Sequence, residues 1–306
     1  MVCKNCAIKP VLLLPNSNIK LCSSCFTKYF EKKVYKTIRK YHLLEKKERV
    51  AVALSGGKDS LSLLYVLNKL ATQQKEVTLI AILIDEGIHG YRELTIKDAK
   101  AFCKKYNIDL KIYSYKQEFG YPLDQLIKKI HLNACTTCGV LRRYLLNKYA
   151  RKLKVTKLAT AHNLDDEAQA VMMNLFRNNM EISARLGPLT GITKDEHFIP
   201  RIKPFYFLTE KETATYAYLK KLTSHFTECP NITGSLRDNT RNLLNDFEEK
   251  YPGTKHAVIN SFLETLPLLK QHYAKLKKIR ECKYCSEPCS QEICKTCQLL
   301  EKIPRR

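Results

Sequence analysis

The sequence lacks any long apolar run, and this absence excludes a membrane-spanning helix. Such a helix needs ~18 to 20 apolar residues, whereas the longest run, residues 77–84, has the length of a strand. The apolar core of a signal peptide is also missing, because Cys3 and Cys6 interrupt the N-terminal segment and residues 11–14 are too few to form one. We therefore expect a cytoplasmic protein with no membrane partner.

Acidic residues are scarce relative to basic ones. The 306 residues include 30 Asp and Glu against 53 Lys and Arg, which gives a net charge of +23. This excess is typical of a protein that binds a polyanion, with nucleic acid the first candidate; the alternative is a basic surface without a partner. Charged residues make up 27% and hydrophobic residues 44% of the chain, so it is neither disordered nor embedded in a membrane.

Cysteine is abundant, and its spacing indicates metal sites. In a reducing compartment, CxxC pairs are typically metal ligands and not disulfides. Two such pairs lie near each end of the chain, and four thiolates can converge on one tetrahedral ion. The expected ligands of two structural Zn²⁺ ions are Cys3, Cys6, Cys22 and Cys25 at the first end and Cys282, Cys285, Cys294 and Cys297 at the second. Disulfides and rubredoxin-like iron sites are the alternatives.

A third group of cysteines lies in the middle of the chain. Cys135 and Cys138 form one CxxC, and Cys229 lies far away in the sequence. Three cysteines can hold an iron–sulfur cluster while leaving one iron without a protein ligand. The spacing is equally compatible with a catalytic disulfide or persulfide pair. Cys103 has an ordinary helical context and is expected in the core.

Strands and helices alternate through the middle of the chain. Segments typical of strands lie at residues 49–54, 77–84, 109–115 and 157–161, and helical patterns lie at 60–70, 93–106, 139–153 and 165–178. This alternation predicts an α/β fold with a doubly wound parallel sheet covered by helices on both faces. After residue 204 we expect no strand and three helices, at 210–222, 238–250 and 256–280.

The strongest single motif follows the first of these strands and opens a helix. Its residues are Ser55-Gly56-Gly57-Lys58-Asp59-Ser60. Glycines allow the backbone to approach a ligand, and the helix presents free N–H groups to phosphate. The GxxxxGK[ST] spacing of a Walker A loop is absent. The motif resembles the pyrophosphate-binding loop (PP-loop) of the ATP pyrophosphatase superfamily, whose members cleave ATP between the α and β phosphates.

Together, the motifs resemble the two-zinc-finger group of tRNA 2-thiouridine synthetases along nearly the whole chain. Beside the PP-loop and the terminal CxxC pairs, three strings carry this resemblance: Asp85-Glu86-Gly87-Ile88-x-Gly90-Tyr91-Arg92, Cys135-Thr136-Thr137-Cys138-Gly139 with Arg142-Arg143, and Ala161-His162-Asn163-Leu164-Asp165-Asp166-Glu167. Cys229-Pro230 adds to it. The resemblance favours an iron–sulfur cluster, 4Fe-4S or 3Fe-4S, on the central cysteines.

The resemblance implies an enzyme that adenylates the C2 oxygen of a tRNA uridine with ATP and then transfers sulfur through the cluster. It also implies a homodimer and a ubiquitin-like protein as sulfur carrier. The first string favours the wobble uridine over the T-loop uridine. The residues expected around the nucleotide are Ala53, Leu54, Ser55, Gly56, Gly57, Lys58, Asp59, Ser60, Ile84, Arg142 and Ala161.

Four residues are expected to act in the reaction. Lys58 would offset charge on the leaving pyrophosphate, and Asp59 and Asp166 would hold Mg²⁺ or position the nucleotide. Asp166 opens a helix, so N-terminal capping is its alternative role. Arg142 stands where some members have Lys; since arginine does not lose its proton, we expect charge stabilisation there and not proton abstraction. Ala161 stands where glycine is usual, which would matter if the backbone needed a positive φ.

These expectations divide the chain into five regions: an N-terminal zinc finger (1–27), a basic helix (28–48), a PP-loop catalytic domain (49–205), a helical extension (206–280) and a C-terminal zinc finger (281–306). The basic helix is either a solvated surface or a surface that faces RNA. Other PP-loop enzymes and a non-enzymatic zinc-finger RNA-binding protein are the alternatives for the whole chain. The central prediction is that the nucleotide pocket and the cysteine trio face the same cavity.

Overall fold

A five-stranded parallel sheet forms the centre of the protein. The computed structural model describes residues 2–14, 17–74, 77–130, 132–192, 198–223, 229–232, 234–275 and 279–303. The sheet has the order β5-β4-β3-β6-β7. Its strands are β3 (Arg49–Leu54), β4 (Thr78–Asp85), β5 (Asp109–Ser114), β6 (Lys157–Ala159) and β7 (Arg201–Ile202). After β3, the chain adds β4 and β5 on one side of it and then β6 and β7 on the other side. This order confirms the predicted doubly wound topology.

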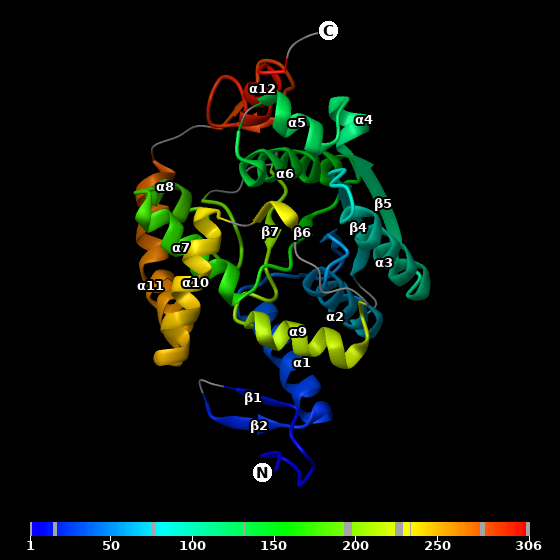
Figure 1. Ribbon diagram of the computed structural model, residues 1–306, viewed down its shortest axis with the longest axis vertical. Helices are drawn as coiled ribbons and strands as arrows, with labels where there is room; N and C mark the ends of the chain where they lie inside the picture. The colour runs from blue at the N-terminus through cyan, green and yellow to red at the C-terminus, as the bar shows by residue number, and fades with distance from the viewer. Residues whose placement is uncertain are drawn as a thin grey trace.

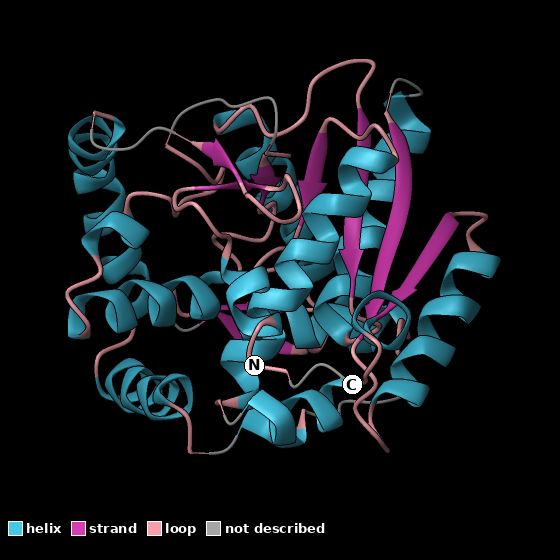
Figure 2. Cartoon of the chain, turned by 90° about the horizontal axis from the view of Figure 1, so that it is seen from above, coloured by secondary structure: helices cyan, strands magenta, loops and turns pink. Residues whose placement is uncertain are grey.

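Helices cover both faces of this sheet, as Figures 1 and 2 show. Alternate residues of β3 face opposite ways: Val50 and Val52 pack with α2 (Lys58–Gln74) and α3 (Arg92–Lys105), whereas Ala51 packs with the other layer. That other layer consists of α4 (Tyr115–Phe119), α5 (Leu123–Ile130) and α6 (Ala134–Lys152). Because β3 pairs in parallel with both β4 and β6, the carboxyl ends of these strands lie at one edge of the sheet, where parallel sheets bind ligands.

The later part of the chain is mainly helical. α9 (Glu210–Lys220) packs on α2, and α7 (Leu164–Phe176), α8 (Met180–Ser183), α10 (Leu236–Lys250) and α11 (Thr254–Ala274) form a separate group with its own core. A short 3₁₀ helix, η1 (Pro230–Ile232), contacts α6. The helix predicted at 256–280 was wrong at its end, because α11 stops at Ala274 and Arg280 belongs to a strand.

The cysteine pairs at each end belong to small modules, which lie at opposite ends of the long axis in Figure 1. The first contains β1 (Leu12–Leu14), β2 (Ile19–Leu21) and the start of α1 (Ser23–Lys40); the second contains β8 (Arg280–Glu281), β9 (Pro288–Cys289) and α12 (Lys295–Leu300). The prediction of no strand after residue 204 was therefore wrong, because two-residue strands are too short to show an alternating pattern. Within the described ranges, every helix is too short or too polar to span a lipid bilayer.

Candidate functional site

The PP-loop connects β3 to α2 and is held together by its own serines. The Ser60 hydroxyl accepts a hydrogen bond from the Ser55 backbone N–H (3.1 Å) and donates to the Gly57 carbonyl (3.1 Å). Gly56 has φ +82°, and a Cβ built there would lie 2.0 Å from the Thr95 carbonyl oxygen. Only glycine fits this turn, because a side chain would both clash and strain the backbone. Ser55 is exposed and Gly57 and Lys58 are half-buried, so a ligand can reach the N-terminus of α2.

Lys58 lies between carboxylates at the start of α2. Its Nζ is 3.1 Å from Asp59 and 3.1 Å from Glu210, the first residue of α9. Burial raises the pKa of Asp59 to about 6 in spite of Lys58, and the charges of Asp166 and Glu210 add to the rise. The Asp59 Oδ1 atom is buried and has no hydrogen-bond partner among the described residues. A buried, unpaired carboxylate oxygen near two more carboxylates fits a Mg²⁺ ion and its waters.

The three acidic residues at the start of α7 differ in their surroundings: two form buried ion pairs, and the third is partly exposed. Asp165 pairs with Lys255 at 2.5 Å, and Glu167 pairs with Lys203 at 2.7 Å. Asp166 is less enclosed: its backbone N–H and side chain form a capping box with Asn163, and its other oxygen lies 3.5 Å from Arg237. Asp166 therefore caps the helix, as its alternative role predicted, and also lies where its charge acts on Asp59.

A buried arginine links the PP-loop to the next strand. Arg92 donates to the Ser55 carbonyl oxygen (2.6 Å) and to the Ile84 carbonyl oxygen, and so joins the ends of β3 and β4. Its Nε forms a 2.7 Å ion pair with Glu86, and both side chains are only 4% exposed. The other oxygen of Glu86 lies 3.5 Å from Arg142 on α6. A continuous polar network thus runs from the loop to α6.

The three central cysteines lie together at the far end of this network. The Cys135 thiol donates to the Asn231 carbonyl (3.2 Å), which brings the Cys229 segment to the N-terminus of α6. Cys229 raises the pKa of both Cys135 and Cys138, after the larger effect of burial. Burial raises the pKa of Cys138 to about 11, opposed by Arg142 one turn later. The fold therefore brings Cys229 to Cys135 and Cys138 across about 90 positions of the sequence.

The trio differs in spacing from the terminal quartets. The four sulfurs of each quartet all lie within 4.8 Å of one another, and neighbouring pairs are 3.4 to 3.7 Å apart. Tetrahedral zinc with Zn–S of about 2.3 Å requires roughly 3.8 Å between sulfurs, so the quartets fit a single ion. The trio is not among the groups that meet this limit in the described residues. A wider arrangement suits a polynuclear cluster, in which each thiolate binds a different iron.

The remaining predicted nucleotide residues surround the same sheet edge. Ile84 is the last residue but one of β4 and Leu54 is the last residue of β3, and both side chains are buried, so only their backbone could contact a nucleotide at this edge. Ala53 and Ala161 are half-buried. Ala161 is not among the residues with positive φ, so alanine in place of glycine does not strain this backbone. Cys103 is buried in the core as predicted.

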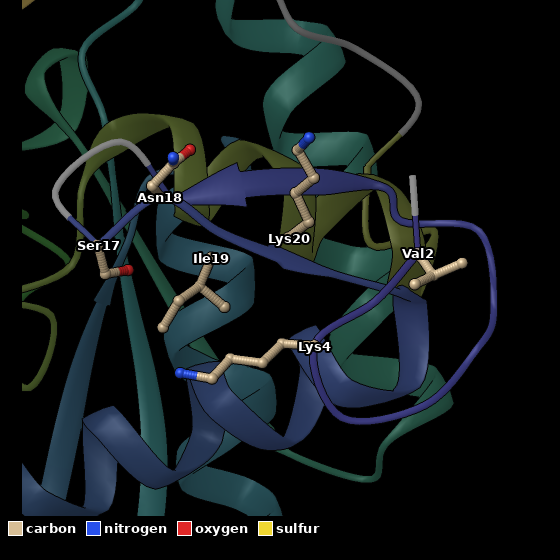
Figure 3. Close-up of a pocket in the computed structure, with 6 residues that line it drawn as sticks. All are labelled: Val2, Lys4, Ser17, Asn18, Ile19 and Lys20. Atoms are coloured by element: carbon tan, nitrogen blue, oxygen red, sulfur yellow. The ribbon is translucent and has the colours of Figure 1, made fainter.

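Positive charge gathers between the trio and β6. The pKa of His162 lies well below its ordinary value. Desolvation is the largest cause, and four nearby cations add to it: Lys203, Arg237, Arg142 and Arg201. The ring of His162 is hydrogen-bonded to Thr160 at 3.0 Å but is exposed and not packed in the interior. A separate open depression on the N-terminal module is lined by Val2, Lys4, Ser17, Asn18, Ile19 and Lys20 (Figure 3) and contains none of the residues above.

Comparisons with known proteins agree with this geometry. The PP-loop domain family matches residues 26–245. Cytoplasmic tRNA 2-thiolation protein 1 of Arabidopsis thaliana is 38% identical over 97% of this chain and 83% of its own. The chain belongs to the PP-loop family of tRNA 2-thiolation proteins. Another member, the tRNA-5-methyluridine(54) 2-sulfurtransferase of Pyrococcus horikoshii, is 37% identical over 97% of this chain and 93% of its own.

A solved structure of this family is also similar. It is the U34-tRNA thiolase NcsA from Methanococcus maripaludis with its 4Fe-4S cluster, which matches with a TM-score of 0.84 and 34% identity. The match covers 100% of this chain and 97% of that one. The family fold therefore extends over both terminal modules as well as the PP-loop domain.

Sequence reasoning missed several residues of the site. Glu210 was not considered, although its position at the start of a helix, one residue after a Thr cap, is a detectable signal. Glu86 and Arg92 lie inside a string that carried the family resemblance, but no role was predicted for either. Arg201 and Arg237 carry no local motif, and only the folded chain brings Arg201 to α6 and Arg237 to α7.

Proposed function

We propose that this protein transfers sulfur to C2 of a uridine in tRNA in an ATP-dependent reaction. The observation that carries the proposal is the network from the PP-loop to the trio: Ser55 to Arg92, Arg92 to Glu86, and Glu86 to Arg142, one turn after Cys138. Two sites joined in this way can act in turn on one base. The net charge of +23 supports a tRNA substrate.

The first half-reaction activates the uridine. The N–H groups at the start of α2 and the Lys58 ammonium bind the phosphates and offset charge on the leaving pyrophosphate. Asp59, Asp166 and Glu210 would hold Mg²⁺, which adds to this charge compensation. The C2 oxygen of the uridine attacks the α-phosphorus, pyrophosphate leaves, and the uridine oxygen then carries AMP. Because enzymes that act on a base commonly extrude it, the uridine enters unstacked.

The second half-reaction replaces the activated oxygen with sulfur. Cys135, Cys138 and Cys229 would hold an iron–sulfur cluster, which when bound supplies the site from which sulfur reaches C2. The Cys138 and Glu86 charges raise the pKa of Arg142 in spite of its desolvation. Arg142 therefore stays cationic and stabilises negative charge as AMP departs, as expected for arginine. The two terminal quartets would each hold Zn²⁺ with a structural role.

The target is proposed to be the wobble uridine. The Asp85–Arg92 string favours this branch, and the similar thiolase from Methanococcus maripaludis is named for U34. The Pyrococcus horikoshii relative is named for position 54 at similar identity, so the T-loop uridine is the second candidate. We further propose a cytoplasmic homodimer that receives sulfur from a ubiquitin-like carrier; the name of the Arabidopsis thaliana relative supports the compartment.

Anaerobic reconstitution tests the proposal directly. The protein is supplied with iron, sulfide, ATP and unmodified tRNA, and the tRNA is digested and analysed by mass spectrometry. We expect 2-thiouridine at the wobble position, and its loss in the Lys58→Ala and Cys138→Ala variants. Cys289→Ala is the matched control, because Cys289 lies outside both quartets and the trio, and it should keep the activity.

Three results would count against the proposal in different ways. Sulfur at the T-loop position would replace the wobble assignment with the second candidate. Thiolation by an iron-free Cys138→Ala variant would remove the cluster from the reaction. Failure of the wild-type protein to bind ATP would favour a non-enzymatic RNA-binding protein.

A further inference from the structure

Within the part of the chain that the structure describes, two arginines beside the cysteine trio have no carboxylate partner. Arg201 projects from β7 to α6, where its Nη2 donates to the backbone carbonyl of Arg143 at 3.3 Å. The Arg143 guanidinium lies back along α6 over Gly139, with Nη1 only 3.1 Å from the position that a Cβ on Gly139 would take. Gly139 directly follows Cys138. Both arginines therefore lie next to the segment that carries the trio.

The nearby carboxylates are all used by other cations. Glu86 pairs with Arg92 and Arg142, and Asp166 with Arg237. Glu167 pairs with Lys203. Among the described residues, no carboxylate lies within ion-pair distance of Arg143 or Arg201.

The local electrostatics agree with this contact pattern. Desolvation, Arg143 and Arg142 lower the pKa of Arg201 to about 10. Desolvation and Arg142 likewise lower the pKa of Arg143. Unrelieved repulsion between cations is unfavourable in the free protein and is removed when an anion binds between or beside them.

We infer that Arg143 and Arg201 form a binding site for the phosphodiester backbone of the RNA, next to the nucleotide that is thiolated. This inference rests on the proposed function and adds to it the residues that hold the backbone. Guanidinium groups match phosphate because their planar donors bind two oxygens at once. Arg143 is exposed on α6, so a large ligand can reach it.

The position of the pair favours RNA over ATP as the source of the phosphate. The nucleotide already has a phosphate site at the start of α2, with its own cation in Lys58. The arginine pair is instead joined to α6 and β7, on the side of the trio. A uridine extruded toward both sites must leave its flanking phosphates close by, and these need positive charge.

The experiment measures binding of unmodified tRNA to the full-length protein over a range of salt concentrations, with ATP affinity measured separately. We expect Arg143→Gln and Arg201→Gln each to weaken tRNA binding about tenfold, as for loss of a charge-assisted hydrogen bond. Each should also reduce the slope of log K against log salt by about 1. The control is Lys104→Gln, which removes one positive charge from an exposed residue of α3, away from the trio. It should leave the slope of log K against log salt nearly unchanged.

Two results would overturn the inference. If Arg143→Gln and Arg201→Gln bind tRNA like Lys104→Gln, the pair does not contact RNA. If they weaken ATP binding and not tRNA binding, the phosphate belongs to the nucleotide. Arg201→Lys, which keeps the charge, should retain most of the salt slope and separates lost charge from altered folding. A wild-type protein that binds tRNA but forms no 2-thiouridine would refute the proposed function and not this site.

Discussion

The Nε atom of Arg92 lies 2.7 Å from Glu86, and the two side chains form a buried ion pair beneath the PP-loop. The remaining nitrogens of Arg92 donate to the ends of β3 and β4 at Ser55 and Ile84. One side chain thus ties the PP-loop, which would bind pyrophosphate, to the carboxyl end of β4. The pair positions the loop without needing to contact a substrate.

Removal of the Glu86 charge should destabilise both the fold and the loop. In Glu86→Gln the buried Arg92 guanidinium loses its counter-charge, and breaking a buried pair costs about 3 to 5 kcal/mol. We expect the free energy of unfolding, measured by urea titration, to fall by this amount, and the affinity for ATP to fall with it. Glu93→Gln makes the same chemical change at a side chain that is 65% exposed and should cost less than about 0.5 kcal/mol. Equal effects of the two substitutions would show that the buried pair has no special role.

The sequence predicted the elements of the sheet better than their ends. β3 occupies the predicted residues, because a continuous apolar run between polar flanks leaves little choice. α6 was predicted to begin at residue 139 but begins at Ala134. The side chain of Asn133 explains the difference, since its oxygen accepts from the N–H groups of Cys135 and Thr136 and so starts the helix before the apolar pattern does.

The candidate site was predictable only where its residues share a local motif. The PP-loop and the two cysteine quartets lie in short strings whose chemistry depends on spacing alone. By contrast, Glu210 reaches Lys58 across 152 positions, and Arg201 reaches Arg143 across 58. Such contacts depend on how α9 and β7 dock on the sheet. No periodicity in the sequence carries that information.

Asp59 should reduce stability at neutral pH in the protein free of Mg²⁺ and ATP. Burial raises its pKa from 3.8 to about 6, so the folded state holds the proton more tightly than the unfolded state. Ionisation therefore costs stability above about pH 6 and costs nothing below about pH 4. We expect Asp59→Asn to melt at a higher temperature than the wild type near pH 7 and the difference to shrink toward pH 4. Asp109→Asn, at an exposed site, should show no such trend. A pH-independent difference for Asp59→Asn would contradict the buried-carboxylate account.

The two terminal quartets should bind metal independently of each other. Cys6 lies 3.4 Å from Cys22 and 3.7 Å from Cys25, so its loss opens the first quartet and leaves the second intact. Metal analysis of Cys6→Ala should show one zinc per chain in place of two, with unchanged iron. Cys289→Ala should retain both, because the second quartet closes without it. Loss of zinc from the Cys289 variant would mean that the quartet has been assigned one wrong ligand.

The substitution Gly139→Ala should stabilise α6 and at the same time weaken RNA binding. Alanine is favoured over glycine in a helix interior by about 1 kcal/mol, so Gly139→Ala should raise the free energy of unfolding by roughly that amount. Its new Cβ would lie 3.1 Å from Nη1 of Arg143, so the guanidinium must move by a few tenths of an ångström from its place over Gly139. We therefore expect weaker tRNA binding with unchanged ATP affinity and unchanged iron content. In an Arg143→Gln background the same change should no longer affect tRNA binding, since the displaced group is absent. If Gly139→Ala weakens binding equally in both backgrounds, its effect does not pass through Arg143.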